Sequence, residues 1–372
     1  MRGLSALAAI ALSGCGGATH SATPTTGTAA PASAAHTPAG VDLLYKAGPT
    51  PTSPDSSASR TRAAAIIRAE LRGVVPAATV RVNHQAGISV FLPGVSPGAP
   101  LTREVGANGQ LEFYDWEANV IGPTGRAEPA VTAVTGGPDA GSAGSGITLY
   151  EAVLRASRRP EVDRPSDTTL GNGLHGVWYL VDRRAHKVLA GPEQTRAALS
   201  GKHAAPRGST VVHVQPGTVI VAAESPNGEP DPTLDSYYVL NDAPALSTKD
   251  ITDPREAVDS GPGGSGQPSV TFNFTTAGRR IFESMTATIA RRGRERSAPA
   301  QTDLQHFAIV LDNRLISVPS IDFNQYPDGV EATNGSEISG AFTTASSRVV
   351  AQLLATGGLP VELTLVSERP SP

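Results

Sequence analysis

The alternation of apolar and polar residues is clearest in the last third of the chain, where it predicts strands and helices in turn. Residues 269–274 alternate as a strand, and Thr275 or Thr276 caps a helix that runs to about residue 289 with one apolar face. Residues 307–311 are apolar throughout, which is typical of a buried strand. The elements that follow are a strand at 315–319, a helix from Thr343 to about residue 356 and a closing strand at 361–366.

Shorter segments with the same two periodicities occupy the first half. A strand at 43–45, a helix at 60–72 and strands at 79–82 and 88–92 follow one another, and this order predicts a small ferredoxin-like unit. The later elements are a strand at 109–113, a helix at 150–157, strands at 177–181 and 187–190, a helix from about Pro192 to Leu199, a hairpin of 211–214 with 218–223, and a strand at 237–240. The fold class is therefore predicted to be α+β.

The N-terminal residues carry the pattern of an export signal. Arg2 supplies a positive charge, residues 4–12 form a short apolar run, and Leu12-Ser13-Gly14-Cys15 matches the bacterial lipobox, where a signal peptidase cleaves before the cysteine. We expect the Cys15 thiol to be acylated, for example with palmitate, because each methylene of an acyl chain gains about 0.8 kcal/mol in a bilayer. The alternative is an ordinary secretory signal with an incidental cysteine.

Composition limits the classes of function. The 372 residues carry a formal net charge of −4, which argues against nucleic acid as a partner. Cys15 is the one cysteine, so the body of the protein is expected to hold no disulfide, cysteine metal site or catalytic thiol. Beyond the N-terminus no segment is as long and apolar as a membrane-spanning helix. The Ala-, Ser-, Thr- and Pro-rich residues before 40 predict a disordered tether.

Candidate chemistry in the sequence is sparse, and we expect no catalytic residue, cofactor or metal. The chain lacks a Gly-x-Ser-x-Gly elbow, a His-Glu-x-x-His motif and a P-loop. Four histidines fall in one stretch without a zinc spacing, namely His175, His186, His203 and His213. Five acids lie near one strand end, where turn formation explains them more simply than a calcium cage does: Asp312, Asp322, Asp328, Glu331 and Glu337.

Two further features have a structural and a functional interpretation. The arginines at 279–280 and 291–296 are expected to lie on a solvated helix end, although they could also contact anionic lipid headgroups or an acidic partner. Phe272 and Phe274 alternate on one strand face and are expected in the core. An apolar groove beside such strands is where an unfolded polypeptide would bind.

Several segments resemble, in the same order, the first periplasmic domain of the SecD protein-export family. The head subdomain of that family is similar to 270–278, 307–321 (Phe-Ala-Ile-Val-Leu-Asp-Asn-Arg-Leu-Ile-Ser-Val-Pro-Ser-Ile), 337–342 (Glu-Ile-Ser-Gly-Ala-Phe) and 357–360 (Gly-Gly-Leu-Pro). Its base subdomain is similar to 88–94 and 111–113, and 238–251 resembles the stretch that connects base and head. The resemblance implies a ferredoxin-like base subdomain plus an α+β head subdomain.

This resemblance and the N-terminal pattern together predict how the chain is divided. The expected parts are a lipoprotein signal peptide at 1–14, a disordered tether at 15–40, a base-like subdomain at 41–118 with its closing strand at 360–367, an insert without a predicted fold at 119–235, and the head at 236–359. SecD continues into membrane-spanning helices that are thought to use proton flow. Because this chain ends at Pro372, we expect no proton-driven motor activity.

The function expected from these features is that of a lipid-anchored accessory protein on the extracytoplasmic face of the cell membrane. The resemblance implies contact with secreted polypeptides or with the Sec translocon. The alternative is a structural or ligand-sensing lipoprotein of the cell envelope that reuses the fold, because a fold does not determine a function.

Overall fold

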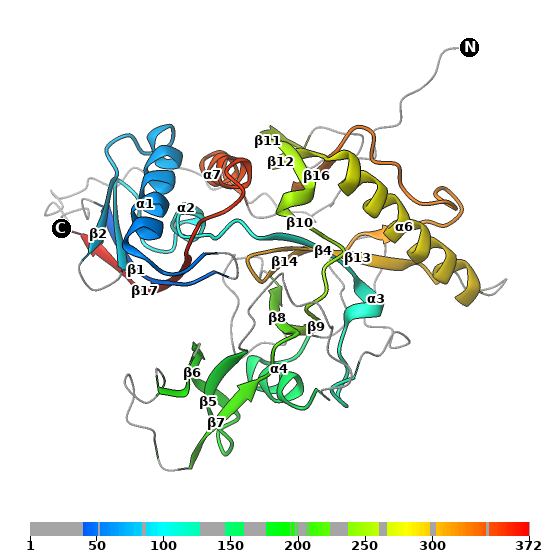
Figure 1. The fold of residues 1–372 in the computed structure, drawn as a ribbon, viewed down its shortest axis with the longest axis horizontal. Helices are drawn as coiled ribbons and strands as arrows, with labels where there is room; N and C mark the ends of the chain where they lie inside the picture. The colour runs from blue at the N-terminus through cyan, green and yellow to red at the C-terminus, as the bar shows by residue number, and fades with distance from the viewer. Residues whose placement is uncertain are drawn as a thin grey trace, which may run out of the picture.

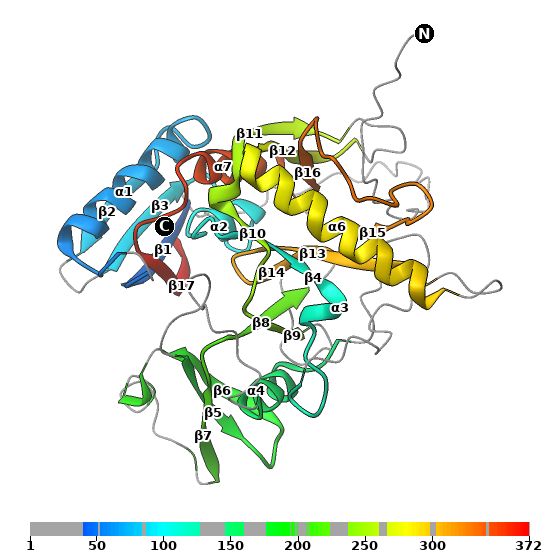
Figure 2. The ribbon, with the colours of Figure 1, turned by 45° about the vertical axis from the view of Figure 1, so that its right-hand side comes forward.

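The described residues form three connected parts (Figure 1). The structure is a computed structural model and describes residues 40–50, 53–83, 87–126, 146–159, 176–193, 195–197, 199, 206, 208–223, 237–259, 266–297, 303–339 and 342–371. We call the three parts the base, which contains both ends of the described chain, the head, and the insert sheet below them (Figures 1 and 2). Among the described residues, no helix has the length and apolar character needed to cross a membrane.

The base is one antiparallel sheet with helices on one face. Its elements are β1 (Gly40–Gly48), α1 (Ser57–Arg72), β2 (Thr79–Asn83), β3 (Gly87–Pro93), α2 (Pro100–Glu104), α7 (Thr344–Ala355) and β17 (Glu362–Ser371). The strand order is β17-β1-β3-β2, and every neighbouring pair is antiparallel. With α1 after β1 and α7 before β17, this is the ferredoxin-like arrangement that the strand order in the sequence predicted. The last helix and strand come from the far end of the chain.

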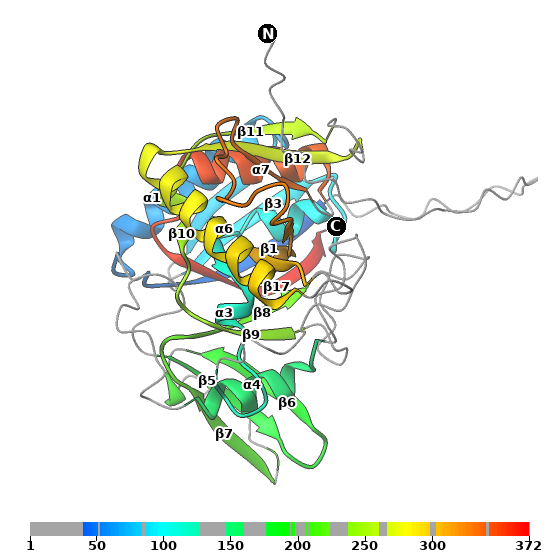
Figure 3. The same ribbon diagram turned by 90° about the vertical axis from the view of Figure 1, so that its right-hand side faces the viewer.

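The head contains a seven-stranded sheet, with α6 (Thr276–Arg296) across one of its faces (Figure 3). The strands are β4 (Leu111–Asp115), β8 (Thr218–Ala223), β9 (Tyr237–Asn241), β10 (Leu246–Ser247), β13 (Gln305–Leu311), β14 (Arg314–Ser317) and β15 (Ser320–Ile321). The path runs β10-β4-β13-β14-β8-β9, and β15 pairs with β13. A smaller sheet of β11 (Ile251–Val258), β12 (Pro268–Phe274) and β16 (Ser336–Ser339) lies over α7. Two short helices, α3 (Trp116–Asn119) and the 3₁₀ turn η2 (Thr248–Asp250), complete the head.

Strand β13 explains why an unbroken apolar run marks the centre of the head. Phe307 and Ile309 pack into the core under α6, whereas Ala308 and Val310 pack into a second core on the opposite face. All four side chains are buried. A strand covered on both faces needs apolar residues at every position, so it loses the alternation of a half-exposed strand.

The insert sheet comprises β5 (Val177–Asp182), β6 (Lys187–Glu193) and β7 (Ser209–Val214), in the order β6-β5-β7. Helix α4 (Leu149–Ser157) covers it, and Thr148 caps this helix by accepting a hydrogen bond from the Glu151 amide. The core of the insert sheet includes Val239 of β9. The insert sheet is therefore packed against the head.

Three details differ from the sequence-based predictions. The predicted hairpin of 211–214 with 218–223 is wrong, because β7 pairs with β5 whereas β8 pairs with β9 and β14. The turn between β7 and β8 links two sheets instead of two paired strands. The predicted helix start at Pro192 is also wrong, since Pro192 lies in β6. The strand predicted at 109–113 and grouped with the base is β4, at 111–115, and it pairs with β13 in the head sheet.

Helix α7 is shared between the base and the head. Val349 and Leu353 are buried in the core of the base, and the adjacent Val350 and Leu354 are buried in the core of the head. Residues one position apart point about 100° apart around a helix, so two neighbouring stripes can face two different cores. Thr343 caps the helix in a reciprocal capping box with Ser346. One helix thus joins the two subdomains mechanically.

Candidate functional site

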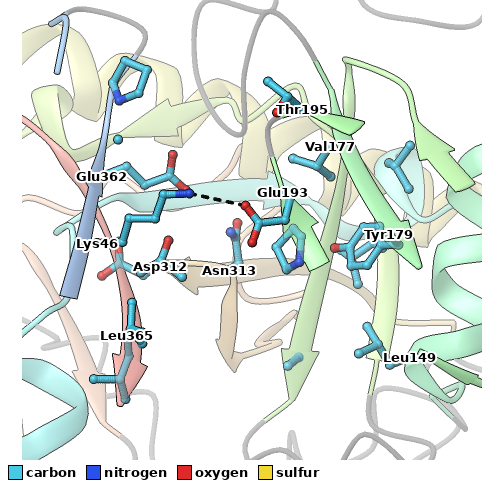
Figure 4. A pocket seen from close by; sticks show the side chains of 18 of the residues that line it. Lys46, Leu149, Val177, Tyr179, Glu193, Thr195, Asp312, Asn313, Glu362 and Leu365 are labelled. Atoms are coloured by element: carbon cyan, nitrogen blue, oxygen red, sulfur yellow. Dashed lines mark hydrogen bonds and ion pairs between the residues drawn. The ribbon is translucent and has the colours of Figure 1, made fainter. Parts of the chain in front are cut away.

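A cleft of about 970 Å³ lies where the base, the head and the insert sheet meet. The base contributes the end of β1 and the start of β17, the insert sheet contributes β5 and β6, and the head contributes β8 and the turn between β13 and β14 (Figure 4). Residues from both ends of the sequence therefore lie beside residues from its middle. No single segment of the chain could form this surface.

The floor of the cleft is the tight turn between β13 and β14. Asp312 and Asn313 have φ values of 50° and 62°, which place both in the left-handed region that asparagine and aspartate tolerate best after glycine. The Asp312 carboxylate accepts hydrogen bonds from the amides of Gly109 at 3.1 Å and Gln110 at 2.9 Å. Burial raises the pKa of Asp312, and these two hydrogen bonds oppose that effect. The turn is thereby fixed to the start of β4.

Next to this turn, an ion pair connects the head with the base. Arg314 of β14 donates to both carboxylate oxygens of Glu104 in α2, each at 2.8 Å. Glu104 is buried, and the Arg314 side chain is 16% exposed. A two-pronged pair of this kind fixes orientation as well as distance. The cleft floor is consequently held by α2 on one side and by β4 on the other.

The mouth of the cleft combines a weak ion pair with exposed apolar side chains. Lys46 of β1 approaches Glu193 of β6 to 3.5 Å, and the Lys46 side chain is 50% exposed (Figure 4). Leu365 and Val366 of β17 are 45% and 54% exposed and line the same cleft. Such a surface can bind another molecule through both apolar and charged contacts.

Lys46, Glu193, Leu365 and Val366 belong to no motif in the sequence. One local signal marks the last two: Leu365 and Val366 are adjacent apolar residues in a strand that otherwise alternates. The register of β1 with β17 shifts at this point, because Leu44 pairs with Ser367 and Tyr45 pairs with Leu365. An interrupted alternation is the expected sequence sign of such a β-bulge.

The predicted lipidation site and part of the histidine group lie outside the described residues. Cys15, the signal peptide and the tether belong to the undescribed N-terminal segment, and His175 and His203 also lie outside the described residues. Acylation of Cys15 stays a prediction. The two described histidines are apart: His213 stacks on Trp178 with ring centroids 4.1 Å apart, and His186 stacks on Tyr150. Within the described ranges, no group of three or more His, Cys, Asp or Glu side chains could hold a metal ion.

The acids near the end of β13 do not converge on one point. Asp312 binds the amides at the start of β4, and Asp322 accepts a hydrogen bond from the Asn324 amide within its own turn. Glu337 lies in β16 opposite Thr271. The turn-forming interpretation of Asp312 and Asp322 is confirmed.

The arginines of α6 have different surroundings. Arg292 donates two hydrogen bonds to Asp115, at 2.6 and 2.8 Å, and a third to Glu117 at 3.2 Å. Glu117 in turn accepts from the His306 amide at 2.9 Å, so the end of α6 is fixed to β13 through this network. Arg279 and Arg291 are exposed, as expected for a solvated helix face.

The two phenylalanines of β12 belong to the core, as predicted. Phe272 is 2% exposed, and Phe274 is partly buried against the same cluster. Both pack edge-to-face on Phe113 of β4, with ring centroids 6.1 and 5.7 Å apart. These rings join the small sheet of the head to the large one.

The comparisons with known proteins agree with the resemblance in the sequence. Residues 222–361 match the family model for the SecDF P1 head subdomain. The chain is 32% identical over 132 residues to the protein translocase subunit SecDF of Brucella abortus, and this stretch covers 36% of the chain and 14% of that protein. It is 32% identical over 133 residues to SecD of Rhodobacter capsulatus, covering 36% of the chain and 20% of that protein.

A longer similarity extends over 213 residues of SecD from Rickettsia typhi, at 27% identity, and covers 56% of the chain and 32% of that protein. The chain thus spans about a third or less of the curated relatives it matches. A solved structure described as a membrane component SecDF that enhances protein export is 18% identical, with a TM-score of 0.37, and covers 88% of this chain and 99% of that one. From the family model and the curated relatives we conclude that this chain carries, at residues 222–361, a subdomain that matches the SecDF P1 head.

Proposed function

We propose that this chain is an accessory factor of protein export that contacts polypeptides on the extracytoplasmic side of the membrane. The observation that supports this most directly is the SecDF P1 head subdomain at residues 222–361, which is built together with a base into one unit. The cleft provides a surface for contact, because it joins exposed apolar side chains with charged ones. The relatives are named as protein translocase subunits, which supports the Sec translocon as a further partner.

Position and mechanism form the second part of the proposal. Acylation of Cys15 would hold the domain at the membrane surface, and the described residues contain no helix that could do so by crossing it. The protein would act by binding alone. It would need no catalytic residue, cofactor or metal. We further propose that it does not itself drive transport with protons, a role that needs charged groups within a membrane span. Nucleic acid is not expected to bind, given the net charge of −4.

Site-directed photocrosslinking in the native bacterium tests the export role. A photoreactive amino acid at position 365, inside the cleft, is expected to capture secretory proteins or translocon subunits. The same residue at position 281, on the solvent-exposed side of α6, serves as the control because Ile281 has similar exposure, 39% against 45%. Recovery of neither class from position 365, together with unchanged secretion after deletion of the gene, would contradict the proposal.

The alternative function, a ligand-sensing envelope lipoprotein, is supported by the volume of the cleft. A volume of about 970 Å³ falls within the usual range of small-molecule sites, roughly 300–1,000 Å³. A small envelope metabolite that raises the melting temperature would favour this function, provided that substitution of Leu365 abolishes the effect.

A further inference from the structure

Strand β17 has an open edge beside the cleft. It pairs with β1 along its whole length, and no other described strand pairs with its second edge. The views agree that this edge lies on the side of the base that faces the insert sheet (Figures 1 and 2). An unpaired edge presents backbone donors and acceptors that another extended chain can use.

The open part of this edge is short and well defined. At its start, the Leu363 amide donates to the Asn108 side chain at 2.9 Å, so that donor is already occupied. At its end, Arg369 and Pro370 are residue types that discourage strand pairing. Between them, residues 364–366 are exposed and carry two apolar side chains. The unprotected stretch therefore coincides with the residues that line the cleft.

The other edge of the base sheet is strand β2, and unlike β17 it is protected from further pairing. β2 has five residues, and Arg68 of α1 donates to the Val80 carbonyl at 2.7 Å. Edge strands that are short and covered by charged side chains are protected from further pairing. By contrast, residues 363–367 of β17 include no charged residue.

Charge decides which kind of chain the cleft favours. Its charged lining residues are Asp55, Glu193, Asp312, Glu362, Lys46 and Arg314. Asp312 is buried and its pKa is raised, so the remaining three acids against two bases leave an excess of one formal negative charge. The partners of Asp55 and Arg314 outside the cleft, Arg60 and Glu104, cancel each other and leave this excess unchanged. An incoming chain with lysine or arginine is complementary to such a lining.

We propose that β17 binds an extended polypeptide segment with alternating apolar and basic side chains by strand addition at residues 364–367. The added strand would place apolar side chains against Leu365 and Val366. One of its basic groups would replace Lys46 as the partner of Glu193, because an ion pair with a half-exposed lysine is weak. This inference rests on the proposed function, in which the cleft contacts polypeptides, and it specifies where and how.

Peptide binding to the full purified chain tests strand addition. The probe is a fluorescent ten-residue peptide of alternating valine and lysine, and we expect saturable binding measured by fluorescence anisotropy. A version of the same peptide with every backbone amide N-methylated should bind at least about tenfold more weakly, since neither of its edges can then donate to β17. A valine–glutamate peptide should also bind at least about tenfold more weakly because of the acidic lining.

Two matched variants locate the site. Val366→Lys should weaken binding of the valine–lysine peptide at least about tenfold, by removing an apolar contact and adding a like charge. Val258→Lys, on the edge strand β11 of the head and 57% exposed against 54% for Val366, should leave binding unchanged. Circular dichroism and melting temperature confirm that both variants fold.

Each contrary result overturns a defined part of the inference. Equal binding of the N-methylated peptide excludes strand addition, equal binding of the glutamate peptide excludes the charge preference, and equal loss in both variants excludes β17 as the site. A wild-type dimer that Val366→Lys dissociates would assign the edge to a second copy of this chain. If peptides bind as expected, but position 365 captures neither secretory proteins nor translocon subunits and secretion is unaffected by gene deletion, the export role fails while the binding mode stands.

Discussion

At the scale of single residues, two buried carboxyl groups of the head make stability depend on pH. Burial raises the pKa of Glu112 to about 7 and that of Asp242 to about 8, with their mutual repulsion contributing for Asp242. Tyr114 donates to Glu112 at 2.7 Å and partly opposes the shift. One Asp242 oxygen has no hydrogen-bond partner. The folded state therefore favours the protonated, neutral form of both groups.

A raised pKa in the folded state means that folding retains protons which the unfolded chain releases. The stabilising effect is complete below the ordinary carboxyl pKa of about 4 and is lost as the pH rises through 7 to 8, by up to about 1.4 kcal/mol per pH unit and group. Urea unfolding at pH 5.5 and 8.5 should show this loss. Asp242→Asn should reduce it, whereas Asp182→Asn should not, because hydrogen bonds to the Ala185 and Arg184 amides lower the pKa of Asp182. The same pH dependence in Asp242→Asn and wild type would contradict the assignment.

At the scale of elements, α7 is the part on which base and head depend together. We expect Leu353→Ala and Leu354→Ala each to destabilise the protein by about 2–5 kcal/mol, because both side chains are almost fully buried. Hydrogen exchange should differ between them. Leu353→Ala should raise exchange first in α1 and β3 of the base, and Leu354→Ala in α6 and β12 of the head. Substitution of an exposed residue, Ala355→Ser, serves as the control. Identical exchange maps for the two leucine variants would contradict the assignment of Leu353 to the base core and Leu354 to the head core.

At the scale of the whole molecule, the proposed anchor is joined to the base. β1 begins at Gly40, which pairs with Ser371 at the end of β17, so the segment that follows Cys15 enters the protein beside the open edge strand. An anchored base would leave the head and the insert sheet to project from it. This placement would present the cleft to polypeptides at the membrane surface.

Cys15→Ala should release the protein from the membrane fraction, because the acyl chains would be lost together with the thiol. Fractionation of cells followed by immunoblotting measures this, and the released domain should retain the wild-type melting temperature. Ser13→Ala keeps a small residue in the lipobox, so this variant should remain with the membrane. A Cys15→Ala protein that still sediments with membranes would contradict lipid anchoring.

The sequence by itself determined the type and approximate bounds of most elements, because local periodicity carries that information. The run at 307–311 predicted a buried strand, Thr343 predicted a helix cap, and the order of the first four elements predicted the ferredoxin-like base. The ordered motifs from 270 to 360 also pointed to the SecD family, which the comparisons confirm. Of the candidate site, only the Asp312 turn could be anticipated.

Which strands pair, and what lies between the subdomains, was decided only by the tertiary structure. Residues 211–214 and 218–223 look like a hairpin because a turn separates two apolar runs, yet each finds a better partner in a different sheet. Lys46, Glu193 and Leu365 are far apart in sequence, and no local pattern indicates that they line one cleft. Pairing and cleft formation depend on burial summed over distant segments, whereas periodicity reports only which face of each segment is apolar.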